Sequence, residues 1–96
     1  MSPEEAERVC DRLHEYVDRG PGENPDAFSK ALAAVRSLRA DASSDYPLSL
    51  LAEIETQLGR WFSDRVLRGT DEALECRRDL LDHISRLEDA WDRLVA

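Results

Sequence analysis

The segment at residues 71–95 carries apolar residues at the spacing of an amphipathic helix. A heptad frame fits the segment, with Arg77 as the exception among the a and d positions. A helix with such a face has to bury it against other helices, so this segment predicts an all-α protein. The apolar residues at the a and d positions are Ala73, Leu80, Ile84, Leu87, Trp91 and Leu94.

Start and stop signals divide the rest of the chain into three more helices. Ser2-Pro3 and Asn24-Pro25 each place a capping residue before a proline, and Pro47 marks a third start. Gly20-Pro21-Gly22 ends the first helix, and Gly69 is expected to end the third. The predicted helices span residues 3–19, 25–40, 47–68 and 71–95, with a linker at 41–46.

These helices predict a small up-down four-helix bundle that occupies residues 1–96 as a single domain. A chain of 96 residues can bury one modest core, and its apolar fraction of 42% argues against disorder. Thr70 is the expected N-cap of the fourth helix, which leaves only a short join after the third. The third and fourth helices should therefore form a long antiparallel hairpin.

The net charge of −8 limits the possible partners. Binding to a nucleic-acid backbone needs clustered positive charge, so direct nucleic-acid binding is not expected. The longest apolar run, residues 31–35, is far too short to span a membrane. Residues 1–8 lack the basic start and apolar core of a secretory signal, so we expect a cytoplasmic protein.

A second apolar line runs beside the heptad face of the fourth helix. Leu74, Leu81 and Val95 form it, and Glu88 interrupts it. The combined apolar arc is wide enough to contact two neighbouring helices. Those neighbours are either the third and first helices of the same chain, or one of them belongs to a second chain.

Arg65 and Arg77 are expected near the centres of the apolar faces of the third and fourth helices. Each either snorkels to solvent, pairs with a carboxylate such as Glu55, or fixes the choice of partner at an interface. Trp61 and Trp91 are expected to pack in the core, although aromatic residues also anchor interfaces.

Catalytic and metal-binding signals are weak. Cys10 and His14 lie four residues apart, a spacing that can place two ligands on one metal, and Cys76 is a further candidate. Cysteines beside an apolar face usually act as small buried hydrophobes, however. The chain has no glycine-rich phosphate loop, HExxH or paired CxxC motif. We therefore expect neither an enzyme nor a cofactor, with a metal or thiol site at these three residues as a minor alternative.

The expected function is that of a non-catalytic, acidic protein–protein interaction module. Such a protein is a small inhibitor or regulator of the antitoxin, immunity, anti-defence or chaperone type, which binds a basic or apolar partner surface. The alternative is a structural homodimer assembled through the third and fourth helices. Mimicry of nucleic-acid phosphates by rows of carboxylates is opposed by the twelve interspersed arginines. The expected interface residues are Arg65, Leu74, Arg77, Leu81, Asp82, Asp89, Trp91 and Asp92.

Overall fold

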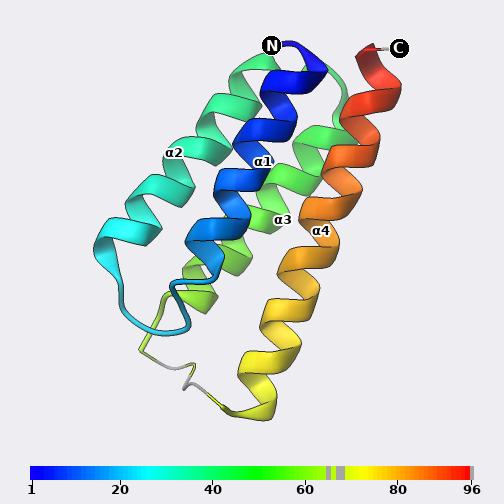
Figure 1. Ribbon diagram of the computed structural model, residues 1–96. Coiled ribbons are helices and arrows are strands. Elements are labelled where there is room, and N and C mark those ends of the chain that lie inside the picture. Colours follow the sequence, from blue (N-terminus) through cyan, green and yellow to red (C-terminus); the bar gives the residue numbers. More distant parts are fainter. Residues whose placement is uncertain (65, 67–68, 96) are drawn as a thin grey trace.

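The computed structural model describes residues 1–64, 66 and 69–95, with the backbone alone for 92–95. The helices are α1 (Pro3–Val17), α2 (Pro25–Asp41), α3 (Asp45–Trp61) and α4 (Asp71–Val95). They form an up-down bundle in which each helix packs against the next and α4 returns to pack against α1 (Figure 1). The predicted all-α bundle is confirmed, including the antiparallel pairing of α3 with α4.

Local capping explains why the helices begin where they do. The side chains of Ser2, Asn24 and Thr70 each accept a hydrogen bond from the backbone N–H three residues later, at 3.2, 3.1 and 3.2 Å. These bonds satisfy donors that the first helical turn cannot satisfy itself. The three N-caps predicted from the sequence are therefore confirmed.

The core runs the length of the bundle and consists of apolar side chains. Within the described part of the chain, no polar or charged residue is buried. All four helices contribute, so burial of apolar surface holds them together. The largest buried side chains include Leu13 and Val17 of α1, Val35 and Leu38 of α2, Leu51, Ile54 and Leu58 of α3, and Leu80, Ile84 and Leu87 of α4.

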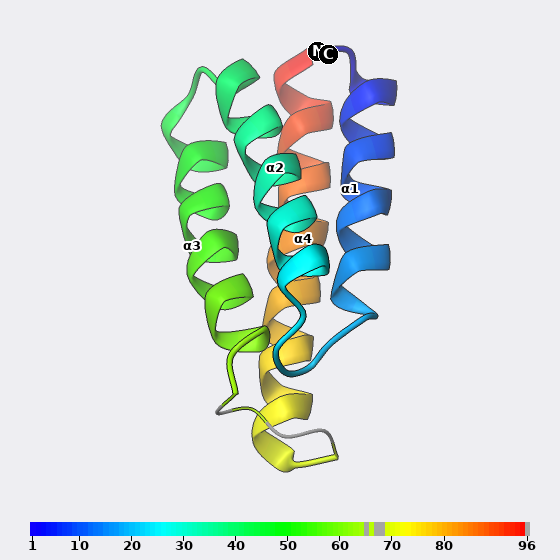
Figure 2. The ribbon, with the colours of Figure 1, turned by 90° about the vertical axis from the view of Figure 1, so that its left-hand side faces the viewer.

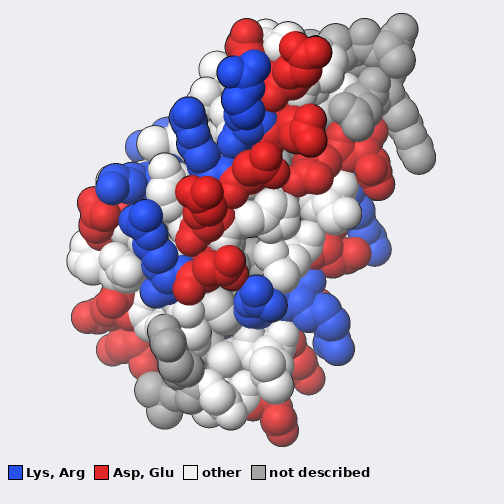
Figure 3. Space-filling view, in the orientation of Figure 1, with Lys and Arg blue, Asp and Glu red and all other residues white. Residues whose placement is uncertain are grey.

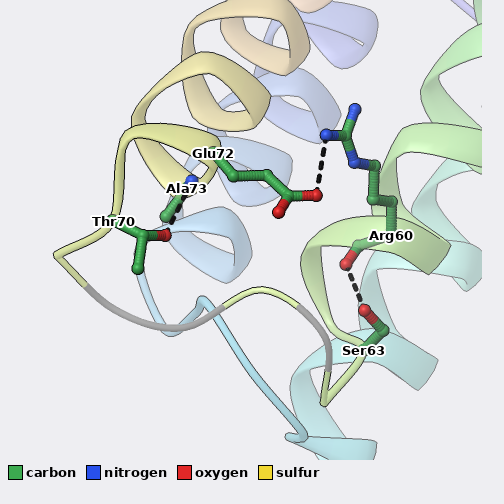
Figure 4. Close-up of polar contacts among 5 residues, drawn as sticks. All are labelled: Arg60, Ser63, Thr70, Glu72 and Ala73. Atoms are coloured by element: carbon green, nitrogen blue, oxygen red, sulfur yellow. Dashed lines mark hydrogen bonds and ion pairs between the residues drawn. The ribbon is translucent and has the colours of Figure 1, made fainter.

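The predicted end of the third helix near residue 68 is wrong, because α3 ends at Trp61. The Trp61 carbonyl accepts a hydrogen bond from Gly22 N–H at 3.0 Å, so it is occupied by a loop distant in sequence. After Trp61 the chain forms a tighter turn of the 3₁₀ type, in which the N–H of Ser63 donates to the Arg60 carbonyl at 3.2 Å. The Ser63 hydroxyl donates to the same carbonyl at 2.7 Å (Figure 4).

The connection between α3 and α4 is consequently longer than the sequence predicted. Val66 folds back into the core with 1% of its surface exposed. Gly69, at a φ of 82°, comes directly before the Thr70 cap of α4 rather than at the end of α3. The first turns of α4 project beyond the ends of the other helices at this end of the bundle (Figures 1 and 2).

Trp61 ties this end of the bundle together. Its indole Nε1–H donates to the carbonyl of Val17, the last residue of α1, at 2.8 Å. Its own carbonyl accepts a hydrogen bond from Gly22 N–H, and Gly20 lies close to the Nε1 side of the indole. One residue of α3 therefore fixes both the end of α1 and the loop that leads to α2.

Gly20→Ala is expected to destabilise the protein by about 1–3 kcal/mol through overpacking. An added Cβ would overlap Trp61 Nε1 and lie 2.9 Å from two other atoms of the indole. Gly59→Ala is the matched control, because a Cβ there meets nothing within 4 Å. Since Gly59 lies inside α3, its replacement should instead stabilise by about 0.5–1 kcal/mol. Urea unfolding followed by circular dichroism measures both, and equal effects would contradict the role of Trp61.

Candidate functional site

The wide apolar arc of α4 is used mostly within the chain. Leu81, from the second apolar line, is half-buried and packs against the core. Leu74 alone of that line is well exposed, at 65%, while the side chain of Val95 lies outside the described residues. The arc therefore contacts α3 and α1 of the same bundle, while Leu74 remains outside these contacts. The buried residues of α4 are Ala73, Cys76, Leu80, Ile84, Leu87, Ala90 and Trp91.

Leu74 borders an open hollow at the end of the bundle. The hollow forms where the first turns of α4 pass the loop after α1, and Pro21 and Trp61 contribute to its wall. Leu74 and Tyr46 are the large apolar residues that stay exposed in the described part of the chain. We call this region the Leu74 hollow. Its exposed leucine side chain is accessible to a partner.

Arg77 does not lie at the centre of an apolar face, so that expectation is wrong. It is exposed and donates to Asp18 at 3.0 Å, which ties α4 to the end of α1. The buried face of α4 includes Cys76 and is therefore displaced away from Arg77. Glu55, a suggested partner, pairs instead with Arg39 at 2.6 Å, and Arg65 lies outside the described residues.

The three aspartates of the expected interface, Asp82, Asp89 and Asp92, lie in different surroundings. Asp82 is exposed and pairs with Arg86 at 3.0 Å along the helix. The side chain of Asp92 is not among those described. Asp89 lies one residue after Glu88 and borders a pocket together with Trp91. The structure thus separates Leu74 and Arg77, near the start of α4, from Asp89 and Trp91, near its end.

A partly enclosed pocket of about 130 Å³ lies between α1 and α4 near the chain termini. We call it the α1–α4 pocket. Asp and Glu side chains gather over α1 and the adjoining part of α4 on this face (Figure 3). The main lining residues are Ala6, Glu7 and Cys10 of α1 and Glu88, Asp89 and Trp91 of α4.

Trp91, which lines the α1–α4 pocket, carries a buried indole N–H. Trp91 is 4% exposed, and its indole N–H has no hydrogen-bond partner among the residues that the structure describes. Glu88 is occupied, because its Oε1 lies 3.2 Å from His14 Nε2. Glu7 and Asp89 are exposed and form no ion pair with any residue that the structure describes. The sequence predicted a buried Trp91, but not that its N–H would be left without an acceptor.

The residues of the minor metal or thiol alternative are not brought together. Cys10 lies beside Glu88 and Trp91, whereas Cys76 lies roughly 18 Å earlier along α4 at 1.5 Å per residue. Among the described residues, no group of three His, Cys, Asp or Glu is placed to hold a metal ion. Cys76 therefore lies far along α4 from Cys10.

The surroundings of Cys76 make its thiol a weak nucleophile. Burial raises the pKa of Cys76, and the positive charge of Arg60 opposes that rise only in part. Arg60 is itself paired with Glu72 at 3.0 Å across the corner between α3 and α4 (Figure 4). Because the thiolate is the reactive form, the raised pKa keeps the sulfur in its less reactive state.

Comparison with known proteins found no matching family model, no matching curated protein and no matching solved structure. Over the described ranges, the chain has no helix with the length and apolar character needed to cross a membrane. Two surface hollows lie along the side of α4 next to α1: the Leu74 hollow at the start of the helix and the α1–α4 pocket near its end.

The two leucines of the second apolar line should respond differently to charge. Leu74→Glu is expected to change the free energy of unfolding by less than about 0.5 kcal/mol, because the side chain is in solvent. Leu81→Glu should cost about 1–3 kcal/mol, because it places a carboxylate against the core. Urea unfolding of each single variant tests this, and similar losses at both positions would contradict the assignment.

Cys76 should make stability fall at high pH. A thiol with a raised pKa in the folded state contributes fully below 9.0, its ordinary pKa, and loses that contribution as the pH rises above it. The free energy of unfolding should therefore decline more steeply between neutral and alkaline pH in the wild type than in Cys76→Ala. Urea unfolding across this range provides the measurement, and parallel pH profiles would refute the prediction.

Proposed function

We propose that this chain is a non-catalytic interaction module that binds and regulates a basic partner protein in the cytoplasm. The observation that carries the proposal is the arrangement of one side of α4. Leu74, Leu81 and Glu88 are spaced by seven residues and so lie on the same side of the helix. That side borders α1, because Glu88 contacts His14 there.

This shared face, the α1–α4 face, combines the two kinds of contact that a protein interface uses. The exposed Leu74 supplies an apolar anchor, and Glu7 and Asp89 supply negative charge that forms no ion pair among the described residues. Leu74 and Glu88 are separated by roughly 21 Å along α4. A patch of that length suits one side of an ordinary protein–protein interface, which buries about 800 Å².

Charge favours a basic partner over a second copy of the chain. Two molecules with a net charge of −8 repel each other, whereas a basic protein is steered toward the acidic surface. The homodimer through α3 and α4 also lacks support from packing, because Leu81 is half-buried against the core of its own chain. We therefore place the partner interaction on the α1–α4 face and treat the homodimer as the weaker candidate.

The proposal is tested with the wild type and Leu74→Glu immobilised in parallel and incubated with a lysate of the producing cells. A protein retained by the wild type and lost by the variant is then purified, and its association rate is measured at low and high salt. Electrostatic steering predicts a fall of about tenfold or more at high salt. An interaction insensitive to salt, or the absence of any Leu74-dependent partner, would count against the proposal. A stable dimer in light scattering would favour the homodimer instead.

A further inference from the structure

The charges around α1 are divided between its two sides. Asp and Glu side chains gather on the side that leads to α4, whereas Lys and Arg side chains lie on the side that leads to α2 (Figure 3). The basic residues at the α2 side include Arg12 of α1 and Lys30 of α2. A protein with a net charge of −8 therefore carries a basic strip next to its acidic face.

The basic strip borders an open groove of about 250 Å³ between α1 and α2, which we call the α1–α2 groove. The floor of the groove is apolar, because Val9 and Tyr16 of α1 and Ala34 of α2 are half-buried and pack against the core. Ala33 and Ser37 line it from α2 and are exposed. Their small side chains leave room for another molecule to approach α2 closely.

The two charged residues that line the groove, Arg12 and Lys30, are both cations available to a ligand. Arg12 is exposed and forms no ion pair with any residue that the structure describes. Lys30 pairs with Asp26 at 3.1 Å, but both side chains are exposed, and such pairs add little to stability. Arg19 also approaches Asp26, at 3.8 Å, and its guanidinium lies 5.5 Å from the centre of the Tyr16 ring. Three cations thus share one exposed carboxylate.

An apolar floor between cations matches one kind of ligand, an amphipathic helix with acidic flanks. Val9 and Tyr16 are seven residues apart, which is two helical turns or roughly 10 Å. A helix that lies along the groove repeats its own apolar residues at this spacing. The carboxylates on the other side of α1 lie about one helix diameter away, roughly 10 Å. That distance is close to the screening length at physiological ionic strength, so they oppose an acidic ligand only weakly.

We infer that the α1–α2 groove binds an acidic amphipathic helix of another protein. Apolar residues of the bound helix contact Val9, Tyr16 and Ala34, and its Glu or Asp side chains pair with Arg12 and Lys30. This inference goes beyond the proposed function, because it concerns the other side of α1 and a ligand of the opposite charge. It accounts together for the apolar floor, the Arg12 side chain without an ion pair and the separation of charge across α1.

The test uses the intact ¹⁵N-labelled protein and a synthetic helical peptide that repeats the sequence Leu-Glu-Glu-Leu-Leu-Glu-Glu. The backbone N–H signals of Val9, Tyr16 and Ala34 are expected to shift in a saturable way as the peptide is added. The signals of Leu74 and Leu81, on the α1–α4 face, should stay in place. Light scattering of the protein without peptide tests the competing occupant, and a dimer whose formation shifts the groove signals would assign the groove to a second copy.

Substitutions separate the groove from general charge attraction. Arg12→Gln combined with Lys30→Gln should weaken peptide binding about tenfold or more, because it removes both groove cations. Arg36→Gln combined with Arg78→Gln removes the same charge from exposed residues outside the groove and should leave binding within about twofold. Ala33→Glu adds a carboxylate to the groove at an exposed position, away from the core, and should weaken binding as well.

The inference is overturned if the acidic peptide causes no saturable shift, if its shifts fall on the α1–α4 face, or if both double variants weaken binding alike. It is also overturned if the same peptide with Lys in place of Glu shifts the groove signals equally. These outcomes are independent of the partner search at Leu74. Failure of that search while the acidic peptide binds would count against the proposed function and leave the groove inference standing. A Leu74-dependent partner together with unmoved groove signals would retain the function and remove the acidic helix.

Discussion

The contact of Trp61 with the end of α1 sets the geometry of the lower half of the bundle. Its N–H holds the Val17 carbonyl, and its carbonyl holds the N–H of Gly22. The second bond lies at the residue where α3 ends. The first turns of α4 project past the ends of the other helices, and Leu74 in these turns is exposed. Trp61 thus joins α3 to the end of α1 and to the loop before α2 through one side-chain and one backbone hydrogen bond.

Features encoded by neighbouring residues could be predicted from the sequence, and features that depend on distant contacts could not. The caps at Ser2, Asn24 and Thr70 each act on an N–H three residues away, so their sequence signals were sufficient. The heptad frame of α4 likewise identified Ala73, Leu80, Ile84, Leu87 and Trp91 as buried, because a helix in a bundle must bury its apolar face, but it missed Cys76 and Ala90. The end of α3 was missed, and at that end Trp61 bonds to Gly22, a residue of another loop.

The candidate site was only partly accessible to the same reasoning. Sequence periodicity placed Trp91 in the core and left open whether Leu81 faced the core or a second chain. Only the packing shows that Leu81 is covered while Leu74 is not. A missing acceptor for Trp91 and the pocket between α1 and α4 depend on how two helices distant in sequence approach each other. No periodicity along one helix encodes that approach.

The exposed ion pairs on α4 have a consequence for the hand of the bundle. Arg77 pairs with Asp18 at the end of α1, and Glu72 pairs with Arg60 of α3. Glu88 lies within hydrogen-bond distance of His14 of α1. Such solvent-exposed pairs add little to the free energy of folding. In a bundle of the opposite hand, however, the two borders of α4 would be exchanged, and each of these charges would face the wrong helix. An apolar core tolerates both arrangements more readily than this set of charges does, so the pairs act to select one arrangement over its mirror-related alternative.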